Sequence, residues 1–331
     1  MPLPSSRRIR QSSGAPGARI AGFGAHRPGA VVGSAEIARR FGRTAEWVRE
    51  RTGIVARRHA AGETREAMAV AAGARALERS DVDGSAVDLV VVASCSAESP
   101  RTGLAALVAD GVGAVGAAGY DLNAACAGFC YALAVAADAV RAGSARCVLV
   151  VGAEKMTSWV DPADLGTSII FGDGAGAAVV VAADEPDIGP VVWGSDGSQA
   201  ELIDIPVGVG VMRMQGQAVF RWATNAVHPV ALRACEQAGV VPRQLDAIVP
   251  HQANLRIVEA LARKLDAPDA VVARDVVDAG NTSAASIPLA LDRLLAEGDV
   301  KPGGLALLIG FGAGLAYAAQ VVRLPRSLPV P

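Results

Sequence analysis

The sequence is short of aromatic residues and of net charge, and both shortages limit what the protein can be. Only 4% of its 331 residues are aromatic while 51% are hydrophobic, so Ala, Val, Leu and Ile must fill the interior. Such small aliphatic residues favour helices packed on sheets, an α/β arrangement. The net charge of −2 gives the whole molecule no electrostatic basis for binding nucleic acid. An acidic partner would therefore need a local basic patch.

Cysteine is also scarce, and its spacing argues against a disulfide framework and against a metal site. The five cysteines form no CxxC pair, and no histidine stands at metal-ligand spacing from them. We therefore expect no metal, and a reducing compartment, the cytoplasm. Cys126 and Cys130 are one helical turn apart, but packing is the better interpretation of Cys130. The other three are Cys95, Cys147 and Cys235.

Two segments resemble targeting or membrane sequences without fitting either. Residues 1–18 are rich in Ser, Arg, Pro and Gly and have no acidic residue, which indicates a disordered leader rather than a transit peptide. Residues 303–322 are uncharged and long enough to span a membrane, but Gly310, Gly312 and Gly314 interrupt them. We expect two buried strands joined by a tight turn there, and no membrane partner.

The chain repeats its own pattern, which predicts two halves of similar fold. A helical run at 132–144 and an apolar run at 147–152 are matched by a helical run at 289–299 and an apolar run at 305–310. Such self-similarity is typical of a duplicated α/β fold. We divide the chain into a leader at 1–18, a first half at 19–183, a linker at 184–190 and a second half at 191–325.

One thiol is placed where a nucleophile would be useful. Small residues after Asn123 open an Ala-rich helix that runs to about Arg141, so Cys126 lies near a helix start. Backbone N–H groups there lack partners and the peptide dipoles favour negative charge, which would make the thiol ionise more easily. Taken alone, however, a cysteine in an apolar helix is more often a small hydrophobic residue.

Three further segments change these odds. His251 lies in Val249-Pro250-His251-Gln252-Ala253-Asn254 after a strand-like run, and Asn281 lies in Gly280-Asn281-Thr282-Ser283 before a helix. With the glycine turn Gly310-Phe311-Gly312-Ala313-Gly314, these segments resemble the β-ketoacyl-ACP (acyl carrier protein) synthase III family of thiolase-like condensing enzymes, over about residues 19–323. The resemblance implies a thiolase-like, pseudo-duplicated fold with five layers in the order αβαβα.

This duplication also suggests where the site lies. We expect Cys126 and Asn281 at corresponding helix starts of the two halves, so a pseudo-twofold packing would bring both to one pocket at the seam.

The resemblance implies a reaction in two steps without a metal or redox cofactor. Cys126 would take an acyl group from acyl-CoA or acyl-ACP, while the backbone N–H groups of Cys126 and Ala313 hold the oxyanion. Malonyl-ACP would then lose carbon dioxide, with His251 Nε2–H and Asn281 Nδ2–H stabilising the enolate. Attack on the acyl-Cys126 thioester gives a 3-oxoacyl-ACP, for fatty-acid initiation or polyketide starter-unit priming.

The resemblance also assigns a substrate channel, a basic rim and a homodimer. Its substrate-binding residues would be Trp47, Arg51 and Thr52 beside a coenzyme A tunnel, Asn254 in the pantetheine channel, Arg221 and Arg256 on a basic rim that meets the carrier protein, and Phe311 of the glycine turn.

Two of the family's positions carry unexpected residues. Leu165 stands where well-known members have an arginine that stacks on adenine, and leucine can make no cation–π or phosphate contact. Ser99 stands where several members have an aromatic side chain that crosses the dimer into the neighbour's acyl pocket. The smaller serine would leave room for a longer or branched acyl group.

The alternative within enzymes is a non-condensing acyltransferase of a specialised-metabolite pathway on the same scaffold. Asn281 argues against it, because acyl transfer alone does not need a pair of enolate donors. A degradative thiolase would need a second catalytic cysteine in the second half, and Cys235 lies in a helical run instead.

Overall fold

Two five-stranded sheets, built from successive halves of the chain, form the frame of the protein. The computed structural model describes residues 12–96, 103–206 and 209–326. The strand order is β1-β7-β6-β4-β5 in the first sheet and β8-β14-β13-β11-β12 in the second. The first sheet consists of β1 (Gly17–His26), β7 (Asp173–Ala183), β6 (Cys147–Lys155), β4 (Leu89–Ala93) and β5 (Ala118–Leu122). The second consists of β8 (Val192–Gly194), β14 (Tyr317–Arg323), β13 (Leu305–Phe311), β11 (Ala247–Pro250) and β12 (Val271–Val272).

The two sheets agree in strand direction as well as in order. In the first, β7 is antiparallel to β1 and β6, and β4 is parallel to β6 and β5. In the second, β14 is antiparallel to β8 and β13, and β11 is parallel to β13 and β12. Every strand of one sheet therefore has a counterpart in the other, which confirms the duplication predicted from the sequence repeat.

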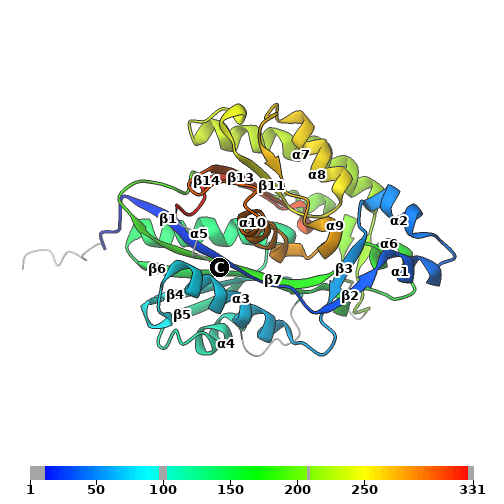
Figure 1. Ribbon diagram of the computed structural model, residues 1–331, viewed down its shortest axis with the longest axis horizontal. Helices are drawn as coiled ribbons and strands as arrows, with labels where there is room; N and C mark the ends of the chain where they lie inside the picture. The colour runs from blue at the N-terminus through cyan, green and yellow to red at the C-terminus, as the bar shows by residue number, and fades with distance from the viewer. Residues whose placement is uncertain (1–11, 97–102, 207–208, 327–331) are drawn as a thin grey trace, which may run out of the picture.

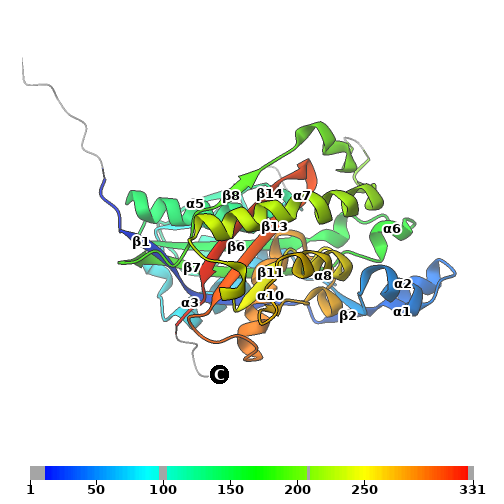
Figure 2. The same ribbon diagram turned by 90° about the horizontal axis from the view of Figure 1, so that it is seen from above.

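Helices complete five layers in the predicted order (Figure 1). The outer helices of the first half cover one sheet, those of the second half cover the other, and two helices lie between the sheets (Figures 1 and 2). The outer layers are α3 (Arg65–Ser80) with α4 (Leu104–Gly111), and α7 (Gly216–Gln237) with α8 (Leu255–Lys264). The central layer is α5 (Gly128–Ala142) with α10 (Ser286–Ala296).

The inner strands are mostly apolar and buried because both faces of each sheet are covered there. Along β4, Val90 and Val92 pack against the outer helices, whereas Val91 and Ala93 pack toward the central layer. This alternation follows from the two-residue period of a strand. The scarcity of aromatic residues is thus met by aliphatic packing on both sides of each sheet.

Smaller elements surround the five layers. A hairpin, β2 (Ala30–Gly33) with β3 (Ala56–His59), brackets α1 (Ser34–Arg40) and α2 (Ala45–Thr52). Others are α6 (Leu165–Ser168), α9 (Val276–Ala279), β9 (Ile203–Asp204), β10 (Arg213–Met214) and the 3₁₀ turns η1 (Gly84–Ala86), η2 (Ala125–Ala127), η3 (Met156–Trp159), η4 (Gly197–Leu202), η5 (Pro242–Gln244), η6 (Ser283–Ala285) and η7 (Ala313–Leu315).

The apolar segment at 303–322 folds as the sequence predicted. It forms the antiparallel pair β13 and β14, joined through the short turn η7. A different stretch, Ala125–Ala142, is the one helix in the described part of the chain that is long and apolar enough to span a membrane. It consists of η2 and α5, and 56% of it is buried inside the protein, where α5 lies between the two sheets.

The predicted leader and linker are not separate from the two halves in the structure. Residues 1–11 lie outside the described part, but β1 begins at Gly17, inside the segment 1–18 expected to be disordered. Ser12 also donates a hydrogen bond to the Ala142 carbonyl at 2.7 Å. In the linker, Asp187 donates from its backbone N–H to Ala18 and accepts from Arg323, so this segment is hydrogen-bonded to both halves.

Candidate active site

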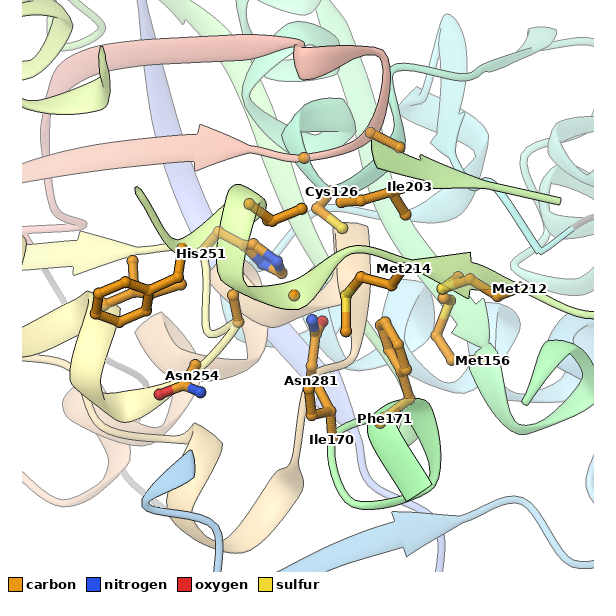
Figure 3. A pocket seen from close by; sticks show the side chains of 18 of the residues that line it. Cys126, Met156, Ile170, Phe171, Ile203, Met212, Met214, His251, Asn254 and Asn281 are labelled. Atoms are coloured by element: carbon orange, nitrogen blue, oxygen red, sulfur yellow. The ribbon is translucent and has the colours of Figure 1, made fainter. Parts of the chain in front are cut away.

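A pocket opens at the seam between the two halves, and it holds the three residues singled out from the sequence. Cys126, His251 and Asn281 all line a cavity of about 930 Å³. They come from η2, from the segment after β11 and from the segment before η6, and their side chains point into one space (Figure 3). The structure therefore brings together residues up to 155 positions apart in the sequence.

Cys126 is held by a turn whose backbone is unusual. Ala125, the residue before it, has φ of 46°, in the left-handed region that favours glycine. The Ala125 N–H donates to Asn123 Oδ1 at 3.0 Å, which supports this conformation. On the other side Gly312 lies so close that a Cβ there would be 2.7 Å from the Cys126 Cβ. The glycine turn thus leaves room for the thiol.

The thiol does not ionise as easily as its place at a helix start suggests. The pKa of Cys126 is raised to about 12: burial is the largest cause and the Glu154 charge adds to it, while hydrogen bonds from the Ser283 side chain and the Cys126 backbone oppose it. Desolvation disfavours the thiolate. The prediction that the thiol ionises easily is therefore wrong, because it rested on the helix start alone and left out the burial of the Cys126 side chain.

His251 is a buried, neutral imidazole. Its backbone N–H donates to the Ile309 carbonyl at 2.7 Å, which fixes it to the end of β13. Its ring meets the Phe311 ring edge to face, with centroids 5.2 Å apart. Burial lowers the pKa of His251 to about 3, so the ring stays uncharged at neutral pH. A neutral imidazole can donate one hydrogen bond into the pocket without bringing a positive charge.

Asn281 has its amide orientation decided by the backbone around it. Its Oδ1 accepts from the Ser283 N–H at 2.8 Å, so the oxygen is the atom turned toward that turn. The Asn281 backbone pairs with the segment before β7, donating to Ile170 and accepting from Gly172. The residue is 5% exposed. With Oδ1 occupied by a donor, Nδ2 is the group left to face the pocket.

Two residues with available backbone N–H groups line the same pocket as the thiol. Cys126 and Ala313 both line the pocket, and neither N–H donates a hydrogen bond to another residue's backbone within the described ranges. Because N–H groups at the start of a helical turn have no partner inside it, both can serve an external oxygen atom.

The predicted channel residues of α2 also line this pocket. Trp47, Arg51 and Thr52 are among its lining residues. The Arg51 guanidinium lies 4.0 Å from the Trp47 ring centroid, and the Arg43 guanidinium lies 5.3 Å from it. The Thr52 hydroxyl donates to Val48 within the helix at 2.8 Å. At this rim an aromatic surface is therefore flanked by positive charge.

The predicted residues of the second half lie on the same rim. Asn254 caps α8 through Oδ1 and donates from Nδ2 to the Arg51 carbonyl at 3.1 Å, so it ties α8 to α2. Arg256 lies over the Phe220 ring at 5.3 Å and, like Arg221, is exposed and lines the pocket. Phe311 lines it beside His251.

Two predicted residues are not placed in the pocket. Leu165 is not among the residues that line this cavity; like Trp47, it is partly buried and packs against the apolar cluster that contains Val48 and Ile169. Its assignment to the substrate site stays a prediction. Ser99 lies outside the described residues.

Comparison with known proteins identifies this arrangement. The family model for 3-oxoacyl-[acyl-carrier-protein (ACP)] synthase III matches residues 120–197, and the model for its C-terminal part matches residues 235–324. A β-ketoacyl-[acyl-carrier-protein] synthase III of Mycobacteroides abscessus is 49% identical over 324 residues, covering 93% of this chain and 94% of the relative. One of Streptomyces lividans is also 49% identical, over 320 residues, with the same coverage. The chain belongs to the β-ketoacyl-ACP synthase III family.

Solved structures agree with this membership. The priming β-ketosynthase of a polyketide biosynthetic pathway superposes with a TM-score of 0.92 at 46% identity, covering 97% of this chain and 99% of that one. The 3-oxoacyl-(acyl carrier protein) synthase III of Pseudomonas aeruginosa superposes with a TM-score of 0.90 at 36% identity, covering 95% and 100%. The synthase therefore has the thiolase-like fold that the motifs implied.

An apolar wall of the synthase's pocket was not predicted from the sequence. Met156, Met212, Met214, Phe171 and Ile203 gather on the side of the cavity opposite Asn254 (Figure 3). Methionine is flexible and fills irregular apolar spaces. The alternating Val211-Met212-Arg213-Met214 is the only sequence signal for this wall, and such a short pattern does not distinguish a pocket from a loop.

Glu154 is a second residue of the synthase that the sequence analysis missed. Its buried carboxylate accepts from the Cys95 and Ser96 N–H groups of the first half, at 3.1 and 3.0 Å. It also accepts from the Ser283 hydroxyl of the second half at 3.1 Å. This carboxylate thereby joins the two halves behind Cys126. A single acidic residue ending an apolar strand was the available signal.

Cys126 and Asn281 lie at corresponding helix starts, as predicted, but at different positions within the two corresponding turns. The counterpart of Asn281 is Asn123, because each accepts a hydrogen bond from the N–H two residues later, 2.8 and 3.0 Å long. The backbone conformations also match, because φ is 49° at Ser283 and 46° at Ala125. The position equivalent to Cys126 in the synthase's second half is therefore Ala284. Both turns still reach the same pocket.

Proposed function

We propose that this protein is a decarboxylating condensing enzyme, which joins an acyl group carried on Cys126 to malonyl-ACP and releases 3-oxoacyl-ACP. The observation that supports this best is the convergence of one thiol, one neutral imidazole and one carboxamide in a single cavity. The relatives named as β-ketoacyl-[acyl-carrier-protein] synthase III support the substrate class. Fatty-acid initiation and polyketide priming both fit this reaction, and the latter is the role of one structural neighbour.

The first step is transfer of an acyl group from a thioester to Cys126. The sulfur forms a bond to the carbonyl carbon, and the negative charge on oxygen is held by the N–H groups of Cys126 and Ala313. The carbon–sulfur bond of the donor then breaks. The proton of the Cys126 thiol ends on the leaving thiol, so no net base is consumed. With the pKa of Cys126 raised to about 12, the thiolate is a minor form at neutral pH, so the attack has to include the loss of this proton.

The second step needs donors that stabilise an enolate without protonating it. His251 is uncharged at neutral pH, and the Asn281 amide turns its nitrogen to the pocket. When malonyl-ACP loses carbon dioxide, the thioester oxygen would accept from both groups. The carbanion carbon then forms a bond to the acyl carbonyl carbon, the bond from that carbon to the Cys126 sulfur breaks, and the released thiolate takes up one proton from solvent to regenerate the thiol. Two neutral donors therefore suit this step better than a charged residue would.

The rim supports a donor or acceptor that carries a phosphopantetheine arm. Trp47 with Arg51 on one side and Arg221 with Arg256 on the other place positive charge at the pocket. These residues suit the phosphate of the arm or the acidic surface of a carrier protein. We keep both acyl-CoA and acyl-ACP as donors, and Asn254 as a residue of the channel.

A homodimer, the cytoplasm and the division into halves also remain proposals. The edge strand β5 pairs only with β4 among the described strands, and Ala118–Asp121 are exposed, which suits pairing with a second copy. In such a homodimer, Ser99 would be expected to act at the acyl pocket of the partner chain. All five cysteines are free, which suits a reducing compartment. Divided at 184–190, each half carries one sheet.

A second candidate is a non-condensing acyltransferase. The same thiol could pass its acyl group to an alcohol or amine, and such a reaction would not use the Asn281 amide. The oriented carboxamide therefore favours condensation.

Intact-protein mass spectrometry with a panel of acyl-CoA and acyl-ACP donors, followed by malonyl-ACP, tests this function. We expect the protein to gain the mass of one acyl group, and malonyl-ACP then to be converted to a 3-oxoacyl-ACP with loss of carbon dioxide. A loaded enzyme that transfers its acyl group unchanged, with no release of carbon dioxide, would support the acyltransferase instead.

A further inference from the structure

Ser286, the first residue of α10, lies directly behind His251. It is fully buried, and its Oγ is 2.7 Å from His251 Nδ1, on the side of the ring away from the pocket. The same oxygen accepts from the Gln252 backbone N–H at 3.3 Å. The serine hydroxyl is therefore shared between the imidazole and the residue that follows it in the chain.

The hydrogen bonds around this hydroxyl distinguish the two neutral forms of the imidazole. If Ser286 donates to Nδ1, the proton of the ring is on Nε2 and every group in the contact is satisfied. If Nδ1 carries the proton and donates to Ser286, the hydroxyl hydrogen has no acceptor among the described residues. A buried donor left without a partner is unfavourable. The first arrangement is the one that the contacts favour.

The backbone on the other side of this contact is held firmly. The Gln252 side chain donates from Nε2 to the Pro250 carbonyl at 2.7 Å and accepts at Oε1 from the Val276 N–H at 3.1 Å. The Gln252 N–H that reaches Ser286 therefore has a fixed position. It occupies the hydroxyl oxygen and leaves the hydroxyl hydrogen for His251.

In the first half of the molecule, the position that corresponds to Ser286 has no hydroxyl. The counterpart of Ser286 in the turn after β5 is Gly128, where an added Cβ would lie 3.1 Å from the Cβ of Ala93, the last residue of β4. In the second half the neighbouring strand end carries His251 instead of an alanine. The serine is thus present only in the half that carries the imidazole.

We propose that Ser286 is a positioning residue that holds His251 in the form with the proton on Nε2, aimed at the enolate oxygen. The effect of Ser286 on catalysis rests on the proposed decarboxylating function, whereas the position of the proton on the His251 ring does not. The serine acts through His251 and does not touch the substrate.

The test combines a spectroscopic and a kinetic measurement on the full-length protein. The ¹⁵N chemical shifts of the His251 ring, assigned with a His251→Gln variant, report which nitrogen carries the proton. We expect Nε2–H in the wild type and a mixture of both forms in Ser286→Ala. Decarboxylation of malonyl-ACP should fall roughly 10- to 100-fold in kcat with little change in KM, since misorienting a catalytic imidazole acts on turnover. Acylation of Cys126 should stay within about twofold.

Controls separate this role from a merely structural one. Ser286→Thr keeps the hydroxyl and should restore the Nε2–H form and part of the rate. Ser80→Ala removes a serine hydroxyl from α3, away from the pocket, and should change neither measurement. An Nδ1–H form in the wild type would overturn the proposal, and so would a Ser286→Ala variant with an unchanged ring and rate. Wild-type protein that shows Nε2–H but never decarboxylates malonyl-ACP would instead contradict the proposed function.

Discussion

The turn at residues 123–128 and the turn at residues 281–286 share one backbone but carry different chemistry. Each begins with an asparagine whose Oδ1 accepts from the N–H two residues later. Each then has a residue near φ of 46 to 49° and a 3₁₀ turn that leads into a central helix. In the first turn the fourth residue is Cys126, and in the second it is Ala284.

The difference between the turns lies in what is buried around them. Asn123 is exposed, whereas Asn281 is 5% exposed and its amide nitrogen faces the cavity. Gly128 has no side chain, whereas Ser286 has a hydroxyl against His251. The duplicated frame thus places two similar turns at one seam. In the proposed function, side-chain changes make one of them a nucleophile and the other a source of hydrogen-bond donors.

Substitution of the two asparagines, one at a time, should show the largest difference between the turns. Asn281→Ala removes an enolate donor, and the loss of one such donor typically lowers kcat by about 10²- to 10³-fold. Asn123→Ala removes only the hydrogen bond to Ala125 N and should slow acylation by less than about tenfold. The rates of malonyl-ACP decarboxylation and of Cys126 acylation, measured separately, check both expectations.

A further variant separates the donor from the turn. Asn281→Asp keeps an oxygen for the Ser283 N–H but has no N–H of its own, so it should acylate normally and decarboxylate poorly. Equal losses in both half-reactions for Asn281 and Asn123 variants would mean that the two turns are not specialised.

The ionisation of Cys126 predicts a smaller effect, the pH dependence of its alkylation, which tests the chemistry assigned to the first turn. Because its pKa is raised to about 12, the thiolate is a minor form at neutral pH and its population should rise about tenfold per pH unit. The rate of alkylation by iodoacetamide, followed by mass spectrometry, should therefore keep rising from pH 7 to pH 10. A plateau below pH 8 would show that the helix start outweighs burial. Cys130, one turn further and buried, serves as the internal reference for accessibility.

Much of the fold could be predicted because its signals are local and repeated. The matching helical and apolar runs indicated two halves of similar fold, and Gly310, Gly312 and Gly314 indicated two strands with a turn rather than a membrane span. The five layers and the gathering of Cys126 with the second-half residues rested on the resemblance and on the internal repeat. Both agree with the structure.

The remainder depended on burial, which a single sequence does not reveal. The predicted easy ionisation of Cys126 considered a helix start, but desolvation is the larger cause of its pKa. Leu165 was assigned from its position in a motif, and its partial burial against the cluster that contains Val48 and Ile169 could not be seen from that position. Glu154 and Ser286 act through partners more than 30 residues away, so no local pattern marks them.

The central claim is that the first half supplies the nucleophile and the second half supplies the donors for one reaction. A single-turnover experiment tests it: an isotopically labelled acyl donor is added, the label is mapped by peptide mass spectrometry, and malonyl-ACP follows. The account predicts the label on the peptide that contains Cys126, then its complete transfer to 3-oxoacyl-ACP with one carbon dioxide released per acyl group. A label on another residue, or carbon dioxide released without consumption of the acyl-enzyme, would contradict it.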